Sequence, residues 1–300
     1  MKNFPFIQIE EKNYPTIIMG EDHFTGWFSK CKKYSSEKKR EKEYFETIST
    51  AYELGVRGFS MSPHPTLIKI LKDFKKSHPD IICISNHHWH SHYFFKDELL
   101  YKEKNIERLR ASEAFYYGPS IINKCKWFQD INTKKRFSKA EIESFRLDEN
   151  KYNFQLDLFE SFCDFFLVGN LCASALINLG RQDIVKKEIE LIRQRNFIPL
   201  GMCEGGGLSL LSFEKLNVAG NWIWINKDFS CPSVDYTLDK IKESNKPLTA
   251  YKAFSLDKGF NLNKSMSFLK NIKQIKSVVV GVKNKQEAKE TFSKLHQFFD

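Results

Sequence analysis

Short apolar runs alternate with longer amphipathic stretches along almost the whole chain. Most of the short runs are hydrophobic throughout, which is typical of parallel strands covered by protein on both faces. The runs with this character are Pro15–Met19, Val56–Met61, Ile81–Ser85, Asp164–Gly169, Ile198–Cys203, Asn221–Asn226, Leu248–Phe254 and Ser277–Val282. The pattern therefore predicts eight strands of a parallel sheet.

The stretches between these runs carry apolar residues at helical spacing, as Ile184, Ile189 and Ile192 illustrate. The predicted helices are Lys39–Leu54, Thr66–Lys76, Asp183–Arg195, Ser233–Ser244, Lys264–Ile272 and Gln286–Phe299. Repeated alternation of strand and helix predicts the α/β class and a single (β/α)8 TIM barrel over residues 1–300. A doubly wound sheet is the rival, but such sheets more often stop at five or six strands.

One long interval, residues 93–153, separates the third predicted strand from the helix that leads into the fourth. The interval is polar and largely helix-prone, with a central YYGPS turn. In a barrel, a segment that follows a strand leaves from the carboxyl face, where active sites form. We therefore expect a long helical insertion that acts as a lid, a cap or an oligomer contact. The last of these alternatives would make the protein a homo-oligomer.

Composition narrows the class of protein. The 300 residues are 41% hydrophobic and 28% charged, which supplies enough apolar material for a large core. No apolar run approaches the ~20 residues that cross a bilayer, and the first residues lack the apolar segment of a secretory signal. Seven dispersed cysteines without a CxxC unit indicate reduced thiols. We expect a cytoplasmic protein without a membrane partner.

The formal net charge of +10 favours an anionic partner. The excess is spread along the chain, and its densest run covers residues 30–42. No motif of the common nucleic-acid-binding folds accompanies this run, so nucleic acid is only a minor alternative. A small anionic or carbonyl-bearing metabolite is the expected substrate.

The predicted carboxyl ends of the strands, where barrel enzymes place their chemistry, are rich in titratable side chains. The catalytic candidates are His23, His64, His88, Glu204 and Lys252. Imidazole shuttles protons near neutral pH and binds divalent metals, so His88 and His90 are also candidates for a metal site. The HHxHxH spacing matches no established ligand motif, and surface histidines without chemistry are the alternative.

Two candidates stand out because of their apolar surroundings. Glu204 follows an apolar strand and precedes three glycines, which would let the backbone approach a ligand or an anion closely. Lys252 lies inside the apolar run of the seventh strand, where an ammonium group needs an acid such as Glu204 beside it. This setting suits a general base, an imine-forming amine or an anion contact. A flexible turn and a lysine that reaches the rim are the structural alternatives.

The final unit, SVVVGVKNKQEAKETF, predicts a strand, a short basic turn and a helix. In barrels, the turns after the seventh and eighth strands often bind phosphate at the amino end of a helix. Lys283, Asn284 and Lys285 occupy that turn, so we expect them to hold an anionic group of a cofactor or substrate.

Several segments resemble elements of the aldo-keto reductase superfamily. FIPLGMCEGGG resembles the fifth strand of that family, and KPLTAYKAFSLDKGF resembles its seventh strand. SVVVGVKNKQEAKETF resembles the last strand and helix, and YFETISTAYELGVRGFSMS resembles the first helix and second strand. The resemblance covers about half of the chain and implies a barrel fold. It also implies NADPH as a hydride donor and an Asp, Tyr, Lys and His tetrad.

The chain departs from that family at each position the tetrad implies. The aspartate position falls at Ser60, the tyrosine in the SPHPT turn, the lysine at Ser85 or Asn86, and the histidine at Gly169 or Asn170. The Ser-Asn pair that holds the nicotinamide amide is replaced by Cys203 and Glu204, and Lys252 stands where a small hydroxyl residue is usual.

The sequence therefore favours an enzyme that uses acid–base chemistry of the lyase or isomerase type, with a divalent metal as a subsidiary version. The first alternative is an NADPH-dependent reductase with a rearranged donor set. The second alternative is a barrel that binds a ligand without catalysis.

Overall fold

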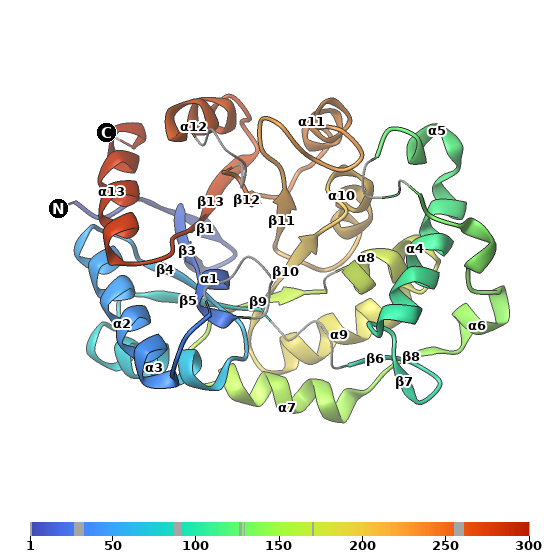
Figure 1. Ribbon diagram of the computed structural model, residues 1–300, viewed down its shortest axis with the longest axis horizontal. Helices are drawn as coiled ribbons and strands as arrows, with labels where there is room; N and C mark the ends of the chain where they lie inside the picture. Colours follow the sequence, from blue (N-terminus) through green and yellow to red (C-terminus); the bar gives the residue numbers. More distant parts are fainter. Residues whose placement is uncertain are drawn as a thin grey trace.

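Eight parallel strands close into a barrel in the computed structural model, which describes residues 2–26, 33–86, 92–125, 128, 130–169, 171–254 and 261–299. Going round the barrel, the strands are β3 (Ile17–Gly20), β4 (Gly58–Met61), β5 (Ile82–Asn86), β9 (Phe165–Val168), β10 (Ile198–Cys203), β11 (Gly220–Trp224), β12 (Leu248–Tyr251) and β13 (Ile275–Gly281). β13 pairs with β3 and closes the ring (Figure 1). The predicted TIM barrel is confirmed, and each of the eight predicted runs overlaps a barrel strand.

The barrel strands bury both of their faces, which explains why their sequences are apolar throughout. Side chains such as Ile18, Ile84 and Leu200 fill the interior, while Ile17, Cys83 and Ile223 pack outward against the helices. A strand that alternated polar and apolar residues would place polar groups in one of these two layers.

Each of the six predicted helices begins within two residues of its predicted start. Helices surround the barrel (Figure 1). They are α1 (Asp22–Thr25), α2 (Glu37–Glu53), α3 (Pro65–Ser77), α7 (Glu149–Phe159), α8 (Leu171–Asn178), α9 (Gln182–Gln194), α10 (Gly207–Glu214), α11 (Val234–Lys242), α12 (Leu262–Lys270) and α13 (Lys285–Leu295). The side chains of Ser36, Ser233 and Asn284 accept hydrogen bonds from the first turns of α2, α11 and α13, and so fix where these helices begin. No described helix is both long and apolar enough to cross a membrane.

An antiparallel hairpin of β1 (Phe6–Ile9) and β2 (Lys12–Pro15) precedes the first barrel strand. The Tyr14 hydroxyl accepts a hydrogen bond from Trp222 Nε1 at 2.8 Å and lies 2.9 Å from Thr249 Oγ1. The hairpin thereby closes the amino-terminal end of the barrel and leaves the carboxyl end for chemistry.

The expected insertion lies between β5 and α7 and is only partly helical. It contains β6 (Tyr93–Phe95), β7 (Glu98–Leu99), α4 (Glu103–Tyr117), α5 (Pro119–Ile122), the 3-10 turn η2 (Thr133–Lys135), α6 (Lys139–Glu143) and β8 (Phe145–Leu147). The three strands form a small antiparallel sheet with β6 in the centre, which the insertion carries in addition to the expected helices. The insertion covers the flank of the barrel where α8, α9 and α10 lie (Figure 1).

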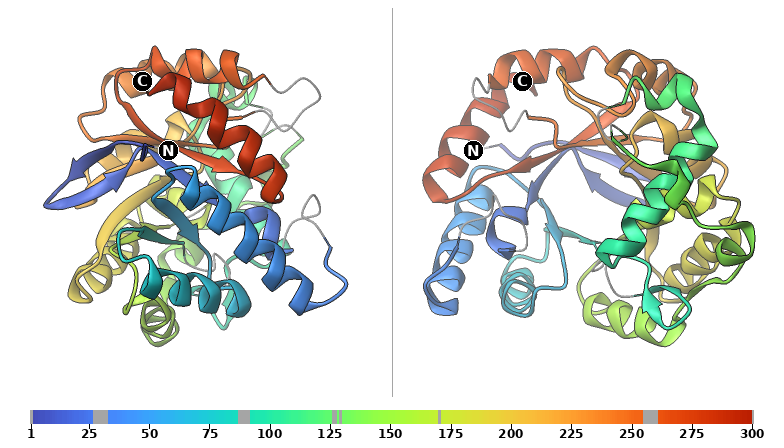
Figure 2. Two further views of the ribbon diagram at one scale, coloured as in Figure 1. Left: turned by 90° about the vertical axis from the view of Figure 1, so that its left-hand side faces the viewer. Right: turned by 45° about the vertical axis from the view of Figure 1, so that its right-hand side comes forward.

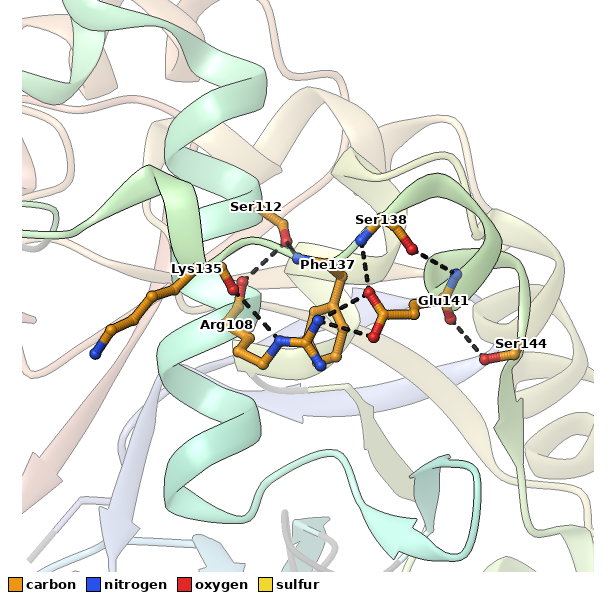
Figure 3. A network of polar contacts seen from close by, with 7 residues as sticks. All are labelled: Arg108, Ser112, Lys135, Phe137, Ser138, Glu141 and Ser144. Atoms are coloured by element: carbon orange, nitrogen blue, oxygen red, sulfur yellow. Dashed lines mark hydrogen bonds and ion pairs between the residues drawn. The ribbon is translucent and has the colours of Figure 1, made fainter.

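Arg108 on α4 organises the insertion from within (Figure 3). Its guanidinium group donates to both carboxylate oxygens of Glu141, at 2.9 and 2.8 Å, and lies 3.9 Å from the centre of the Phe137 ring. The Ser112 hydroxyl, one turn further along α4, accepts a hydrogen bond from the Phe137 backbone N–H. These contacts hold α6 and the chain before it against α4.

Both end segments of the chain meet at the seam between β13 and β3 (Figure 2). The Phe4 ring stacks on His296, with ring centres 4.1 Å apart, and the Phe4 N–H donates to the Gly55 carbonyl. His296 Nε2 in turn lies 2.8 Å from the Leu54 carbonyl oxygen at the end of α2. The amino-terminal segment is therefore held between the end of α2 and the end of α13.

Candidate active site

Three charged side chains gather at the carboxyl-terminal mouth of the barrel: Asp22 after β3, Glu204 after β10 and Lys252 after β12. Asp22 reaches solvent, yet the walls of the mouth limit its hydration, and this desolvation raises the pKa of its carboxyl group. The Lys252 ammonium group acts in the opposite direction and lowers that pKa, whereas the Glu204 carboxylate raises it. Lys252 and Glu204 therefore both lie within electrostatic reach of Asp22.

Lys252 adopts a backbone conformation that few non-glycine residues use, with φ of +50°. The Asn226 side-chain amide donates to the Lys252 carbonyl oxygen at 3.0 Å and holds this turn. The turn carries Lys252 Nζ to 4.2 Å from the centre of the Trp224 ring. Strain of this kind persists where surrounding contacts enforce it, and it is concentrated at functional sites. The ammonium group is thus placed at the mouth by an aromatic wall and a fixed backbone.

Glu204 and Tyr251 each contribute a buried polar atom that forms no hydrogen bond with the described residues. Glu204 Oε2 and the Tyr251 hydroxyl are shielded from solvent, and neither has a hydrogen-bond partner among the described residues. Burial raises the pKa of Tyr251 well above its ordinary value, and the Glu204 carboxylate adds to the effect, so the phenol stays protonated. Buried polar groups in native proteins are nearly always paired, so these two atoms suit a polar ligand.

The glycines after Glu204 serve close packing. Gly206 has φ of +59°, and a Cβ atom there would lie 2.7 Å from the Cys231 carbonyl oxygen. The Gly207 N–H, at the start of α10, donates to that same oxygen at 3.0 Å. This donor is used within the protein, so the glycine run brings two loops together and the expected backbone anion site loses one of its N–H groups.

Glu21, next to Asp22, is buried beneath the mouth. The hydroxyl groups of Ser60 and Ser62, both at the end of β4, donate to its two carboxylate oxygens. Burial raises the pKa of Glu21, and the neighbouring Asp22 raises it further. Ser60 therefore supports a buried carboxyl group at the position where the family resemblance implies an aspartate.

The structure places His23 and His64 against the surrounding helices. His23 lies beside Gly281 at the end of β13 and within electrostatic reach of Glu287 and Lys283, and burial lowers its pKa. His64 caps the start of α3, with Nε2 at 2.6 Å from Arg40 Nη1 on α2. Burial lowers the pKa of His64, and the Arg40 charge lowers it further.

The predicted metal site rests on two histidines of one short segment. His90 and His88, which is also a catalytic candidate, lie outside the described residues. Among the residues that the structure does describe, no group of three or more His, Cys, Asp and Glu side chains could hold a metal ion.

The predicted phosphate-binding turn lies beside an open groove of about 510 Å³ between α2 and α13. The groove is lined by Lys39, Lys42, Glu43, Glu46, Asn284, Lys285 and Gln286. Asn284 caps α13 by accepting from the Glu287 N–H at 2.9 Å, and the Lys283 N–H donates to the Glu287 carboxylate. Three lysines against two glutamates give this groove a positive balance that suits a phosphate group.

Sequence reasoning identified Glu204 and Lys252 but gave less weight to Asp22 and overlooked Tyr251 and Trp224. Asp22 directly precedes His23 in the sequence, and an aspartate at this place equally suits the cap of a turn. Tyr251 and Trp224 are the last residues of apolar strands, so hydrophobic burial explained them equally well. Their position at the carboxyl end of a strand was the available signal.

No protein-family model matches the sequence, and no curated protein matches it. Solved structures do match across nearly the whole chain. A putative aldo-keto reductase from Pseudomonas aeruginosa is 11% identical, with a TM-score of 0.57, covering 98% of this chain and 95% of its own. An aldo/keto reductase from Klebsiella pneumoniae, in complex with NADP and acetate, is 8% identical, with a TM-score of 0.52 and coverage of 98% and 90%.

A glycerol dehydrogenase from Gluconobacter oxydans is 11% identical, with a TM-score of 0.50, and covers 96% of this chain and 89% of its own. Identities this low carry the fold but not the reaction. The chain thus has the (β/α)8 barrel of the aldo-keto reductases, as the resemblance implied.

Proposed function

We propose that the protein is an enzyme that acts on the carbonyl group of a small, anionic metabolite, and that it does so as a reductase dependent on NADPH. The observation that carries the proposal is the group of Asp22, Glu204 and Lys252 at one mouth, beside the unsatisfied Tyr251 hydroxyl. The Lys252 ammonium group would polarise the carbonyl oxygen and pass a proton to it. Asp22, within electrostatic reach of Lys252, would help to orient the ammonium group toward the substrate.

The residues fit NADPH at both ends of the site. The positive groove of Lys39, Lys42 and Lys285 suits a phosphate group at the end of β13. Glu204 Oε2, buried without a partner, suits the amide N–H of a nicotinamide ring. When bound, NADPH would supply the hydride. Lys252 stays the proton source in this arrangement, because no member of the family tetrad stands at its implied position.

The second candidate is proton transfer without hydride, as in an isomerase or lyase. It is favoured by the replacement of the tetrad and by the pairing of a carboxylate with an ammonium group at one mouth. In this version Glu204 removes a proton next to the carbonyl group, and Lys252 stabilises the oxyanion or forms an imine.

NADPH titration separates the two candidates. We expect micromolar binding by calorimetry, weakened about tenfold by Lys285→Glu, which places a negative charge in the groove. Lys289→Glu on the same helix, away from the groove, is the matched control and should bind as the wild type does. Absence of NADPH binding, together with exchange of substrate protons for deuterium, would replace the reductase with the second candidate.

Catalysis is tested at the mouth itself. Lys252→Met and Glu204→Gln should each lower kcat/KM by about 100-fold. The first variant removes the group that meets the developing charge on the carbonyl oxygen. The second removes the carboxylate that holds the nicotinamide amide in the reductase, or that takes the proton in the second candidate. Lys227→Met, which removes a lysine paired with the neighbouring Asp228, should leave kcat/KM unchanged. If neither mouth variant alters turnover, the enzyme assignment fails, and ligand binding without catalysis takes its place.

A further inference from the structure

Two buried cysteines from distant parts of the chain are in contact. Cys125 follows α5 in the insertion, and Cys231 lies in the loop between β11 and α11. Their sulfur atoms are 2.7 Å apart, and the residues are 1% and 2% exposed. Neither is part of a disulfide bond, which would need the sulfur atoms to approach to ~2.05 Å.

Each cysteine belongs to a different part of the fold, and the one on the barrel side is rigidly held. The Cys231 carbonyl accepts hydrogen bonds from the Gly207 N–H at 3.0 Å and from Thr237 Oγ1 at 3.2 Å. These contacts fix Cys231 to the starts of α10 and α11. On the other side, Cys125 packs with Ala114 of α4 in the same apolar cluster as Leu208 of α10. The two sulfur atoms therefore meet at the junction of insertion and barrel.

We propose that Cys125 and Cys231 form a disulfide site that a small peroxide oxidises, and that the bond ties the insertion to the barrel. One thiol sulfur attacks a peroxide oxygen, the O–O bond breaks, and a sulfenic acid forms with release of one water molecule. The second thiol sulfur then displaces the hydroxyl group as a second water molecule. Two thiols and one hydrogen peroxide molecule thus yield one disulfide and two water molecules. This site is independent of the proposed reaction at the mouth.

The environment makes this oxidation slow and its product durable. Contact with Cys125 raises the pKa of the Cys231 thiol well above its ordinary value, and burial and the Glu113 carboxyl group raise it further. Few thiolates are present at neutral pH, so the rate of oxidation rises with pH. Once formed, the bond is shielded from solvent, and a thiol reductant reaches it only after the junction opens.

The disulfide bond would also stabilise the fold and restrict the turn that carries Glu204 at the mouth of the barrel. It would close a loop between residues 106 positions apart, and cross-links of loops this long raise the unfolding temperature by about 5 °C or more. Gly206, two residues after Glu204, packs against the Cys231 backbone. A fixed Cys231 therefore limits movement of the turn that carries Glu204.

Peptide mapping tests the site. The full-length protein is treated with hydrogen peroxide in its folded state, its remaining thiols are alkylated in denaturant, and non-reduced peptides are analysed by mass spectrometry. We expect loss of two of the seven thiols, a linked peptide that joins Cys125 to Cys231, and a rise in Tm of about 5 °C. Dithiothreitol should reverse the change only when denaturant is present.

Variants make the result specific. Cys125→Ser and Cys231→Ala should each abolish the linked peptide and the rise in Tm. Cys172→Ser, which removes a buried thiol elsewhere, should retain both. A linked peptide between Cys83 and Cys163, which also contact each other, in place of the expected one would overturn the proposal. Retention of all seven thiols in the wild type, or an equal rise in Tm in Cys125→Ser, would do the same.

Discussion

Glu188 on α9 is a carboxyl group held entirely inside the protein. Its oxygens accept hydrogen bonds from the Tyr93 and Tyr152 hydroxyl groups and from the Gly169 N–H, the last two at 3.0 and 3.1 Å. Burial nevertheless outweighs these donors and raises the pKa of Glu188 to about 7. The group joins the insertion, through Tyr93, to the end of the barrel strand β9.

This raised pKa makes the stability of the fold depend on pH. In the unfolded chain Glu188 loses its proton near its ordinary pKa of 4.5, whereas in the folded protein it keeps the proton up to about pH 7. Between these values the folded state binds more protons than the unfolded state does. The contribution of Glu188 to the free energy of unfolding is therefore complete below pH 4.5 and is lost as the pH rises to about 7. Ionisation of the buried group costs on the order of a few kcal/mol.

We therefore expect Glu188→Gln, which cannot ionise, to lose less stability than the wild type between pH 5 and pH 8. Urea unfolding at several pH values measures the free energy of unfolding for both proteins. Glu190→Gln, on the exposed side of the same helix, is the control and should follow the wild-type pH profile. A Glu188→Gln profile as steep as that of the wild type would contradict this account.

At the scale of elements, the insertion depends on a few side chains because its elements other than α4 are short. Its helix α6 spans five residues, and its strands span two or three. Such short strands show no periodic pattern, and the strands β1 and β2 of the hairpin span only four residues each. Neither small sheet could therefore be predicted from the sequence. Long helices with a clear apolar side, such as α9, were predicted to within one residue at each end.

Arg108→Lys should loosen the insertion while the barrel stays folded. Lysine keeps the charge but cannot form the paired bonds to Glu141 or stack flat on Phe137. We expect cleavage by chymotrypsin within residues 93–147 to accelerate about tenfold, because local opening becomes more frequent. Lys134→Arg, at an exposed position of the same insertion, is the control and should be cleaved at the wild-type rate. Cleavage at an unchanged rate in Arg108→Lys would show that the network does not hold the insertion.

At the scale of the whole molecule, the sequence was sufficient to predict the barrel and to predict that polar groups after the strands lie at one mouth. Both follow from the alternation of apolar strands and helices, since parallel strands must end on one side. The direction of each side chain after its strand was not predictable. Lys252 reaches Trp224 because its backbone adopts a left-handed conformation, and the His64 side chain points to Arg40. Contacts with residues distant in the sequence set both of these directions.

The seam where Phe4 stacks on His296 brings the two ends of this chain together and makes it a candidate for circular permutation. A short Gly/Ser linker could join the ends, and new ends could be opened beside Asp97, whose side chain is fully exposed at the tip between β6 and β7. We expect the permuted protein to give the wild-type far-ultraviolet circular dichroism spectrum and one cooperative unfolding transition. An opening inside β10, among buried neighbours, should yield no folded protein. If the Asp97 permutant also fails to fold, formation of the seam must require the native order of the chain.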